Sequence, residues 1–524
     1  MLAVQVAFCY HQQTGFGIGV ELTSFREKPM RQFFNPQRQL GDCDIAAIEL
    51  DPRSRDDIPR LLRGLQYIYM TDPVRKQVEA ILAEVVPQRA DGSGAVSSET
   101  GRPGMDQWQI LVLGTLRLGL NADYDRIQEL ANQHTTIRQM LRCSDWDEPE
   151  RFHLQTIKDN LRLFTPDVLD RINQVVVNAG HALLKKSLLD GLEVRCDSSV
   201  VETHVHYPTD INLLYDAVRK SIETVAKLCD EVAISDWRQS AYNVRCLKKA
   251  YRRLQRLKHS RSKNEDKRKA RDAEIEQACR DYLDVAGSFL GRVWVTRELL
   301  RQVHKLPEVV LRELDCYVAH GERQRDQVRR RVLEGERIPH AEKVFSIFQE
   351  HTEWINKGKA GVPVELGLRV VIVEDQYRFV LHHRVMQHET DDQIAVVVIE
   401  ETVQRFPSVI SASMDKGFHS RANQEALPNV VAFPVLPKKG KCSAEEAAYE
   451  SQPRFVRLRR SHSAVESAIN ALEVHGLDLC RDHGIDGFER YVAMAVVARN
   501  IHRIGAILIA RDAEEEQRRR KRAA

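Results

Sequence analysis

Residues 191–210 read GLEVRCDSSVVETHVHYPTD, and this stretch decides how the rest of the chain is interpreted. A short apolar run leads to Asp197, and several polar side chains come after it: Ser198, Ser199, Glu202, His204 and His206. A carboxylate at the end of a buried strand is a typical place for a divalent metal, because hard cations bind oxygen ligands that a rigid backbone holds in place. One aspartate is not a site, so further ligands must come from elsewhere in the chain.

Two later segments offer carboxylates of the same kind. In residues 409–420, VISASMDKGFHS, Asp415 comes after a second apolar run. In residues 459–480, RRSHSAVESAINALEVHGLDLC, Glu466 lies on a stretch with helical spacing. Asp197, Asp415 and Glu466 are therefore the candidate ligands of one metal centre.

The expected elements have the order of an RNase H-like α/β domain with a mixed five-stranded sheet and flanking helices. Strands are expected at 191–202, 362–375, 376–386, 409–415 and 430–437, with a helix at 391–406. Residues 211–350 have few Gly or Pro and carry charged residues and Leu at helical spacing. This pattern predicts an all-helical insertion that splits the sheet after its first strand.

In such a domain, the three carboxylates converge at one edge of the sheet. Two Mg²⁺ ions held there, or Mn²⁺ in their place, activate a water or a 3′-hydroxyl and stabilise the leaving oxygen of a phosphoryl transfer. Each carboxylate taken alone is more often a surface or capping residue. The prediction depends on all three lying on the expected elements.

A helical region precedes the first strand. Apolar residues recur at helical spacing over 57–90 with a break near Thr71, and 106–142 reads as two or three short helices with turns near 119–121 and at His134. A compact helical module ahead of a catalytic domain is a candidate for binding DNA ends, and a plain helical scaffold explains the same pattern.

Six parts are expected along the chain. They are a weakly ordered extension (1–29), a helical DNA-binding region (30–150), helices and the first strand of the catalytic domain (151–210), the helical basic insertion (211–355), the remainder of the catalytic domain (356–510) and a basic tail (511–524).

Basic residues are clustered although the formal net charge is only +3. The clusters lie at 245–271, 323–331, 454–460 and 518–522. Such runs neutralise phosphates and gain from counterion release, or they simply form a solvated helix face. The candidate DNA contacts in the first cluster are Lys248, Lys249, Arg252 and Arg253.

The ten cysteines are scattered, with no CxxC or other close pair. This spacing favours a reducing cytoplasm and argues against a disulfide framework or a zinc finger. No apolar run reaches the roughly 18 residues of a membrane span. We therefore expect a cytoplasmic protein without a membrane partner.

Several segments together resemble insertion-sequence transposases of the DDE class, most closely the ISNCY group, over roughly residues 30–510. Residues 195–220 resemble the first-aspartate motif of that class, and residues 413–420 resemble the second-aspartate motif. Residues 462–508 resemble the glutamate helix and the residues that follow it. Residues 101–131 are similar to the N-terminal helices of these transposases, and residues 351–376 to their second strand with its lead-in. The resemblance implies a metal-binding triad of Asp197, Asp415 and Glu466.

The same resemblance implies Mg²⁺ as cofactor and DNA as partner, both the terminal inverted repeats of the element and the target. It implies strand cleavage at the element's ends, joining of the freed 3′-hydroxyl to target DNA, and a homodimer or larger synaptic complex in the bacterial cytoplasm, at the nucleoid when bound to DNA. Two rival interpretations remain. One is an RNase H-like nuclease that never joins strands, and the other is an inactive, transposase-derived DNA-binding protein.

The chain departs near the glutamate from the transposases that it resembles. Glu473 stands where many of them have a basic residue, and His462 where an arginine is common. Phosphate contacts are therefore expected from Arg459, Arg460 or His462 instead. Lys416, next to Asp415, is a further candidate as a point charge.

Other residues have alternative interpretations. His204 and His206 are expected to be structural or to contact phosphate, because Mg²⁺ disfavours imidazole. Glu202 and Asp210 compete for a metal role. Stacking on a splayed base and ordinary core packing both remain open for the three candidate aromatics, Trp237, Trp294 and Trp354, with core packing favoured.

Overall fold

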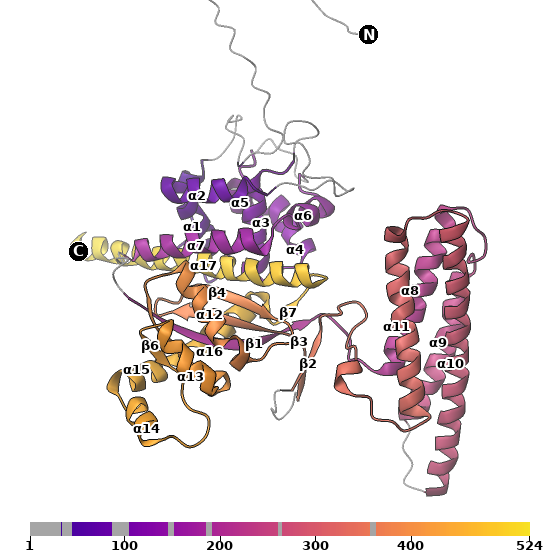
Figure 1. The fold of residues 1–524 in the computed structure, drawn as a ribbon. Helices are drawn as coiled ribbons and strands as arrows, with labels where there is room; N and C mark the ends of the chain where they lie inside the picture. The colour runs from indigo at the N-terminus through magenta and orange to yellow at the C-terminus, as the bar shows by residue number, and fades with distance from the viewer. Residues whose placement is uncertain are drawn as a thin grey trace, which may run out of the picture.

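The computed structural model describes residue 33 and residues 44–85, 104–144, 151–184, 191–259, 265–356 and 363–523. The extension expected at 1–29 lies outside these residues. Within them the protein is a mixed α/β structure, in which a seven-stranded sheet is surrounded by helices and a separate helical bundle stands beside it (Figure 1).

The N-terminal region forms the short helices that the periodicity predicts. They are η1 (Ile45–Ala47), α1 (Ile58–Met70), α2 (Asp72–Leu82), α3 (Gln107–Gly119), α4 (Tyr124–Gln133), α5 (Thr135–Met140), α6 (Leu154–Leu161) and α7 (Pro166–Leu183). Thr71 separates α1 from α2 as expected, and His134 caps α5 through a hydrogen bond that its ring accepts from the Ile137 amide. Each break therefore falls where a capping residue stands.

The sheet contains all five predicted strands. They are β1 (Leu192–Thr203), β3 (Val364–Asp375), β4 (Val380–Met386), β5 (Val409–Met414) and β6 (Phe433–Val435). Two more strands, β2 (Glu353–Asn356) and β7 (Leu479–Cys480), were not predicted, because segments of four and two residues are too short to carry an alternating pattern.

The strand order is β2-β3-β1-β5-β6, with β4 also paired to β3 and β7 to β1. β1 is antiparallel to β3, which is antiparallel to β4, whereas β5 runs parallel to β1 and β6 parallel to β5. β1 thus lies in the middle of the sheet, with an antiparallel half on one side and a parallel half on the other.

Several helices come after β4 along the chain. They are α12 (Asp391–Arg405), η3 (Lys416–Phe418), α13 (Arg421–Ala426), η4 (Leu427–Asn429), α14 (Ala444–Glu450), α15 (Pro453–His462), α16 (Ala464–Leu472), η5 (Glu473–Leu477) and α17 (Ile485–Ala523). α12 packs on β4 and β5, and α16 packs on β1 and β3. Residues 511–523, expected as a basic tail, continue α17 as helix.

The chain between β1 and β2 is helical, as its composition predicts. It forms α8 (Asp210–Glu231), α9 (Ser240–His259), α10 (Glu265–Gln302), α11 (Glu308–Val332) and the short η2 (His340–Glu342). The four long helices enclose their own apolar core, which includes Leu214, Val218 and Tyr282. Figure 1 shows them as a bundle to one side of the sheet.

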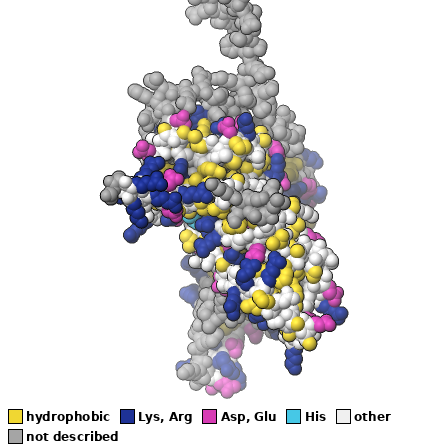
Figure 2. Space-filling view, turned by 90° about the vertical axis from the view of Figure 1, so that its left-hand side faces the viewer, with side chains coloured by type: hydrophobic (Ala, Val, Ile, Leu, Met, Phe, Trp, Pro, Cys, Tyr) yellow, Lys and Arg dark blue, Asp and Glu magenta, His cyan; other side chains and the backbone are white. Residues whose placement is uncertain are grey.

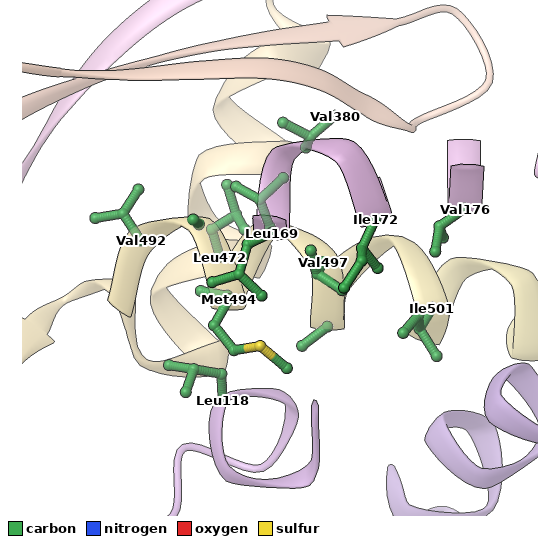
Figure 3. Packing of buried hydrophobic residues seen from close by; sticks show 14 of the residues in the cluster. Leu118, Leu169, Ile172, Val176, Val380, Leu472, Val492, Met494, Val497 and Ile501 are labelled. Carbon is green, nitrogen blue, oxygen red and sulfur yellow. The ribbon is translucent and has the colours of Figure 1, made fainter. Parts of the chain in front are cut away.

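One continuous core joins the sheet to the N-terminal helices, and α17 lies at its centre. Figure 3 shows Val497 and Ile501 of α17 among side chains of α7, including Ile172, with Leu118 of the α3 end and Val380 of β4 nearby. The N-terminal helices and the sheet therefore share a hydrophobic core.

By length and composition α17 could cross a membrane, so the expectation that no segment qualifies was incomplete. Of its most apolar stretch, 67% is buried inside the protein, against α1, α3 and α7. This is the environment of a core helix.

Candidate metal centre on the central strands

Asp197 lies in the middle of β1 and not at its end, which corrects the expectation from the sequence. β1 continues to Thr203, and Asp197 pairs with Ile372 of β3 on the antiparallel side. On the parallel side, β5 ends at Met414, which pairs with Cys196. The carboxyl group therefore stands at the point where the parallel half of the sheet ends, although its own strand goes on.

Asp415 is the next residue after β5. Because Met414 pairs with Cys196, Asp415 and Asp197 are the next residues along two neighbouring parallel strands, which run about 4.8 Å apart. The Asp415 carboxylate accepts a hydrogen bond from the Gly417 amide and so caps η3. That turn holds the side chain beside β1.

Glu466 joins the two aspartates from the first turn of α16, the helix that packs on β1 and β3. Its effect is visible on Asp197. Burial first, and then the negative charges of Asp415, Asp391 and Glu466, raise the pKa of the Asp197 carboxyl to about 6, while one hydrogen bond from the Ser198 amide lowers it. Asp415 and Glu466 thus lie near enough to Asp197 for their charges to act on it.

Asp391 is a fourth carboxylate, which the sequence patterns did not reveal. It is the first residue of α12, and its charge acts on Asp197. Its Oδ1 is buried and has no hydrogen-bond partner among the described residues. The sequence did not mark Asp391 as a metal ligand, because its surroundings are those of an ordinary helix start. Thr390 and Gln393 form a capping box, and acidic residues are common in the first turn of a helix.

A solvent-open pocket of about 280 Å³ adjoins these carboxylates. Its lining includes Ser198, Asn356, Arg369, Asp391 and Gly417. The charges that act most strongly on Asp197 are all negative. A group of carboxylates beside an open pocket is suited to binding a cation.

The basic residues expected around the glutamate helix occupy different environments. Lys416 and Arg460 are exposed, and Arg459 is 3.7 Å from Glu450. His462 is largely buried, with Nδ1 3.2 Å from the Ser413 hydroxyl, and burial lowers the pKa of its imidazole. The lowered pKa disfavours a positive charge on His462, which makes it a poor phosphate contact, whereas the exposed side chains of Lys416 and Arg460 are accessible to DNA.

The four basic residues on α9 are all exposed: Lys248, Lys249, Arg252 and Arg253. Arg253 forms an ion pair with Asp281 at 2.7 Å. They are separate from the carboxylate group, since they belong to the bundle. On the face seen in Figure 2, Lys and Arg form several groups with hydrophobic and acidic side chains between them, and no single basic field.

The competing polar residues of the stretch 191–210 are not brought into the carboxylate group. Glu202 lies five residues beyond Asp197 on an extended strand, about 16 Å away. Asp210 is paired with Arg331 at 2.7 Å, and His206 is 3.4 Å from Asp216. His204 is exposed just past the end of β1.

The three tryptophans differ in environment. Trp237 is buried and donates a hydrogen bond to the Thr296 hydroxyl at 3.0 Å, as core packing predicts. Trp294 is exposed on α10. Trp354 of β2 lines a second pocket, of about 600 Å³, between the base of the bundle and the sheet.

That pocket combines aromatic and basic side chains. Its lining includes Tyr207, Phe345, Lys258, Lys343 and Trp354. Trp354 donates a hydrogen bond from Nε1 to Asn356 Oδ1 at 3.2 Å, and Asn356 lines the pocket beside the carboxylates. The two pockets therefore lie on one face of β2, where alternate residues point the same way.

One of the N-terminal helices, α3, can be excluded as the helix that binds DNA. All residues of α3 are buried, so this helix cannot enter a groove of DNA without unfolding the core. Its Arg117 is paired with Asp482 at 2.7 Å inside the protein. α3 is therefore a scaffold helix.

Comparisons of the chain with protein-family models, with curated proteins and with solved structures find no match. Its function is therefore inferred from the site itself.

Proposed function

We propose that this protein is a DDE transposase of the ISNCY type, which cleaves DNA at the ends of its element and joins the 3′-hydroxyl to a target. The observation that carries the proposal is the convergence of Asp197, Asp415 and Glu466 from a central strand, the neighbouring parallel strand and a covering helix. Sequence motifs alone selected these three residues.

The sheet supports the fold assigned in this proposal. In an RNase H-like domain, three antiparallel strands are followed by two strands parallel to the first, and the order here, β4-β3-β1-β5-β6, has that form. The bundle α8–α11 enters after the first strand of that domain. We therefore assign an RNase H-like catalytic domain split by an all-helical insertion.

The donor set fits divalent metal. Asp197, Asp415 and Glu466, with Asp391 beside them, offer carboxylate oxygens, the ligands that Mg²⁺ and Mn²⁺ prefer. Bound metal would neutralise the cluster and supply an activated water or 3′-hydroxyl for in-line attack on a phosphodiester. The residues of the chain fix the ligands: β1 and β5 set the two aspartates, and α16 sets the glutamate.

DNA is expected to run from the carboxylates across β2 toward the base of the bundle. Asn356 and Trp354 mark that direction, and Lys258 and Lys343 supply positive charge in the larger pocket. Aromatic and basic groups together suit a distorted strand, because a splayed base stacks on a ring while phosphates meet the cations. The exposed α9 residues extend the basic surface further along the bundle.

A strand-joining assay tests the proposal against a nuclease of the same fold. DNA from either side of the protein's own gene, precut to leave 3′-hydroxyl ends, is incubated with Mg²⁺ and a supercoiled target plasmid. We expect joined products that Glu466→Gln abolishes. Nicking without any joined product identifies a nuclease, and neither activity, with DNA binding retained, identifies an inactive DNA-binding protein.

A further inference from the structure

A second cluster of metal-ligating side chains lies beside the middle of α11, in the helical bundle. Cys316 and His320 are four residues apart on α11, so they project from successive turns of one helix face. Glu350 approaches them from the segment that returns from the bundle to β2. Thiol, imidazole and carboxylate are the three ligand types that zinc uses in proteins.

The ligand atoms are already close together. His320 Nε2 is 2.8 Å from Glu350 Oε1, and the Cys316 thiol is 3.1 Å from the same oxygen. All three ligand atoms lie within 4.8 Å of one another. Around a tetrahedral zinc with bonds of about 2.0–2.3 Å, ligand atoms stand roughly 3.3–3.7 Å apart, so small side-chain rotations would suffice.

We propose that Cys316, His320 and Glu350 bind one Zn²⁺ ion, with a water as the fourth ligand. The side chain of Glu350 is 58% exposed, so solvent reaches the position opposite the buried imidazole. Two residues of one helix at this spacing form a familiar half of zinc sites, and the third ligand closes the site from another segment.

Protons must leave for zinc to bind. The Cys316 thiol carries its proton within hydrogen-bonding distance of Glu350, whereas zinc binds the thiolate. Zinc replaces that proton and the hydrogen bonds that Glu350 now accepts, and binding therefore releases protons to solvent. Affinity should rise with pH.

The site would fasten the bundle to the sheet. Glu350 belongs to a segment with several bonds to the sheet side: the Gln349 side chain accepts a hydrogen bond from the Gly484 amide at 2.9 Å, and Thr352 Oγ1 lies 2.9 Å from Thr203 Oγ1 at the end of β1. A zinc bridge between this segment and α11 would restrict how the bundle pivots against β1. Such a metal would be separate from the proposed catalytic ions, because none of its ligands belongs to the carboxylate group.

Cobalt titration of the full-length, metal-stripped protein tests the inference. Co²⁺ bound to a thiolate gives a charge-transfer band in the near ultraviolet, which carboxylate-only sites lack. We expect one equivalent of Co²⁺ to give that band, Zn²⁺ to displace it, and Cys316→Ser to abolish it. His320→Gln and Glu350→Gln should weaken Zn²⁺ binding by more than roughly tenfold.

Two controls keep the result independent of the catalytic proposal. Cys442→Ser removes another cysteine near a glutamate, Glu450, and should leave the band intact, as should Asp197→Asn. If Cys316→Ser misfolds, protection of Cys316 from alkylation by Zn²⁺ in the unaltered protein replaces it as the readout. A wild-type protein without the cobalt band, or without protection, would overturn the inference and leave only a hydrogen bond between His320 and Glu350 beside a thiol.

Discussion

Asp197 and Asp415 stand next to each other on neighbouring parallel strands, because Cys196 and Met414 are paired in the residues just before them. β1 continues past Asp197, whereas β5 ends just before Asp415. The two carboxylates therefore lie where the pairing between β1 and β5 stops. Burial and mutual repulsion both oppose ionisation of Asp197. The site is therefore destabilising without metal, as expected of a functional cluster.

Asp197→Asn should stabilise the metal-free protein. The pKa of Asp197 is about 6 in the folded protein against 3.8 ordinarily, so the folded state binds this proton more tightly, and stability is lost as pH rises through that range. At pH 8 in a chelator, the variant should be more stable by up to about 3 kcal/mol. Asparagine keeps the acceptor for the Ser198 amide. Chemical denaturation at pH 8 and pH 5 measures the difference, which should shrink at pH 5.

Glu400→Gln, an exposed change on α12, serves as the control and should show no such pH dependence. Added Mg²⁺ should stabilise the unaltered protein more than the Asp197→Asn variant, because metal binds the folded state only. If the unaltered protein and the Asp197→Asn variant were equally stable at pH 8 in the presence of chelator, the carboxylates would not repel one another as proposed.

Asp391→Asn should weaken metal binding although no sequence motif marks this residue. Its buried Oδ1 has no hydrogen-bond partner in the part of the chain that the structure describes, and its charge acts on Asp197, so Asp391 belongs to the carboxylate group. We expect Mn²⁺ affinity, measured by electron paramagnetic resonance, to fall about 10- to 100-fold, as for residues that support metal ligands. Its neighbour Asp392 accepts a hydrogen bond from Thr390, so Asp392→Asn is the matched control. An equal loss in both variants would show a general charge effect.

Asp482→Ala should destabilise the protein severely. Arg117 and Asp482 form a buried ion pair at 2.7 Å, and the guanidinium also lies over the Tyr124 ring at 4.0 Å. Removing only the carboxylate leaves a buried charge without its partner, which destabilises by about 3–5 kcal/mol. Replacing both residues, with Arg117→Met and Asp482→Leu, should recover much of that loss in thermal unfolding. A single variant as stable as the unaltered protein would refute this role of the pair.

Gly505→Ala should disrupt the contact between α1 and α17. A Cβ at position 505 would stand 1.8 Å from the Arg60 carbonyl oxygen, and one at Gly64 would stand 2.1 Å from that of Ile501. Neither helix backbone can shift without opening the core, so we expect a loss of more than about 2 kcal/mol. Gly291, on α10, has open space around its Cβ position. Gly291→Ala should instead stabilise the helix by about 0.5–1 kcal/mol. Similar melting temperatures for the Gly505→Ala and Gly291→Ala variants would contradict the prediction.

The sequence predicts long helices and strands with a clear hydrophobic period well. It predicts short strands and contacts between distant segments poorly. β1, β3 and β5 and the helices α8–α11 were predictable because each carries a full period of its pattern. β2 is too short for that, yet it carries Trp354 and Asn356 to the two pockets. Asp391 was missed because its local context is that of a helix cap, and only the tertiary fold brings it to Asp197.

The N-terminal region shows the same limit. Its helices were predicted, but the pattern of α3 could not reveal that every face of that helix is covered. The covering element includes α17, from the far end of the chain. Local periodicity contains no information on such a distant partner.

Metal-dependent nicking by the three carboxylate variants is the decisive test of the proposed catalytic centre. DNA from the flanks of the protein's own gene is incubated with Mg²⁺ or Mn²⁺, and both strand nicking and binding are measured for the unaltered protein and for Asp197→Asn, Asp415→Asn and Glu466→Gln. We predict that all four proteins bind this DNA equally and that only the unaltered one nicks it. Nicking that persists in any of the three variants would show that these carboxylates are not the catalytic ligands.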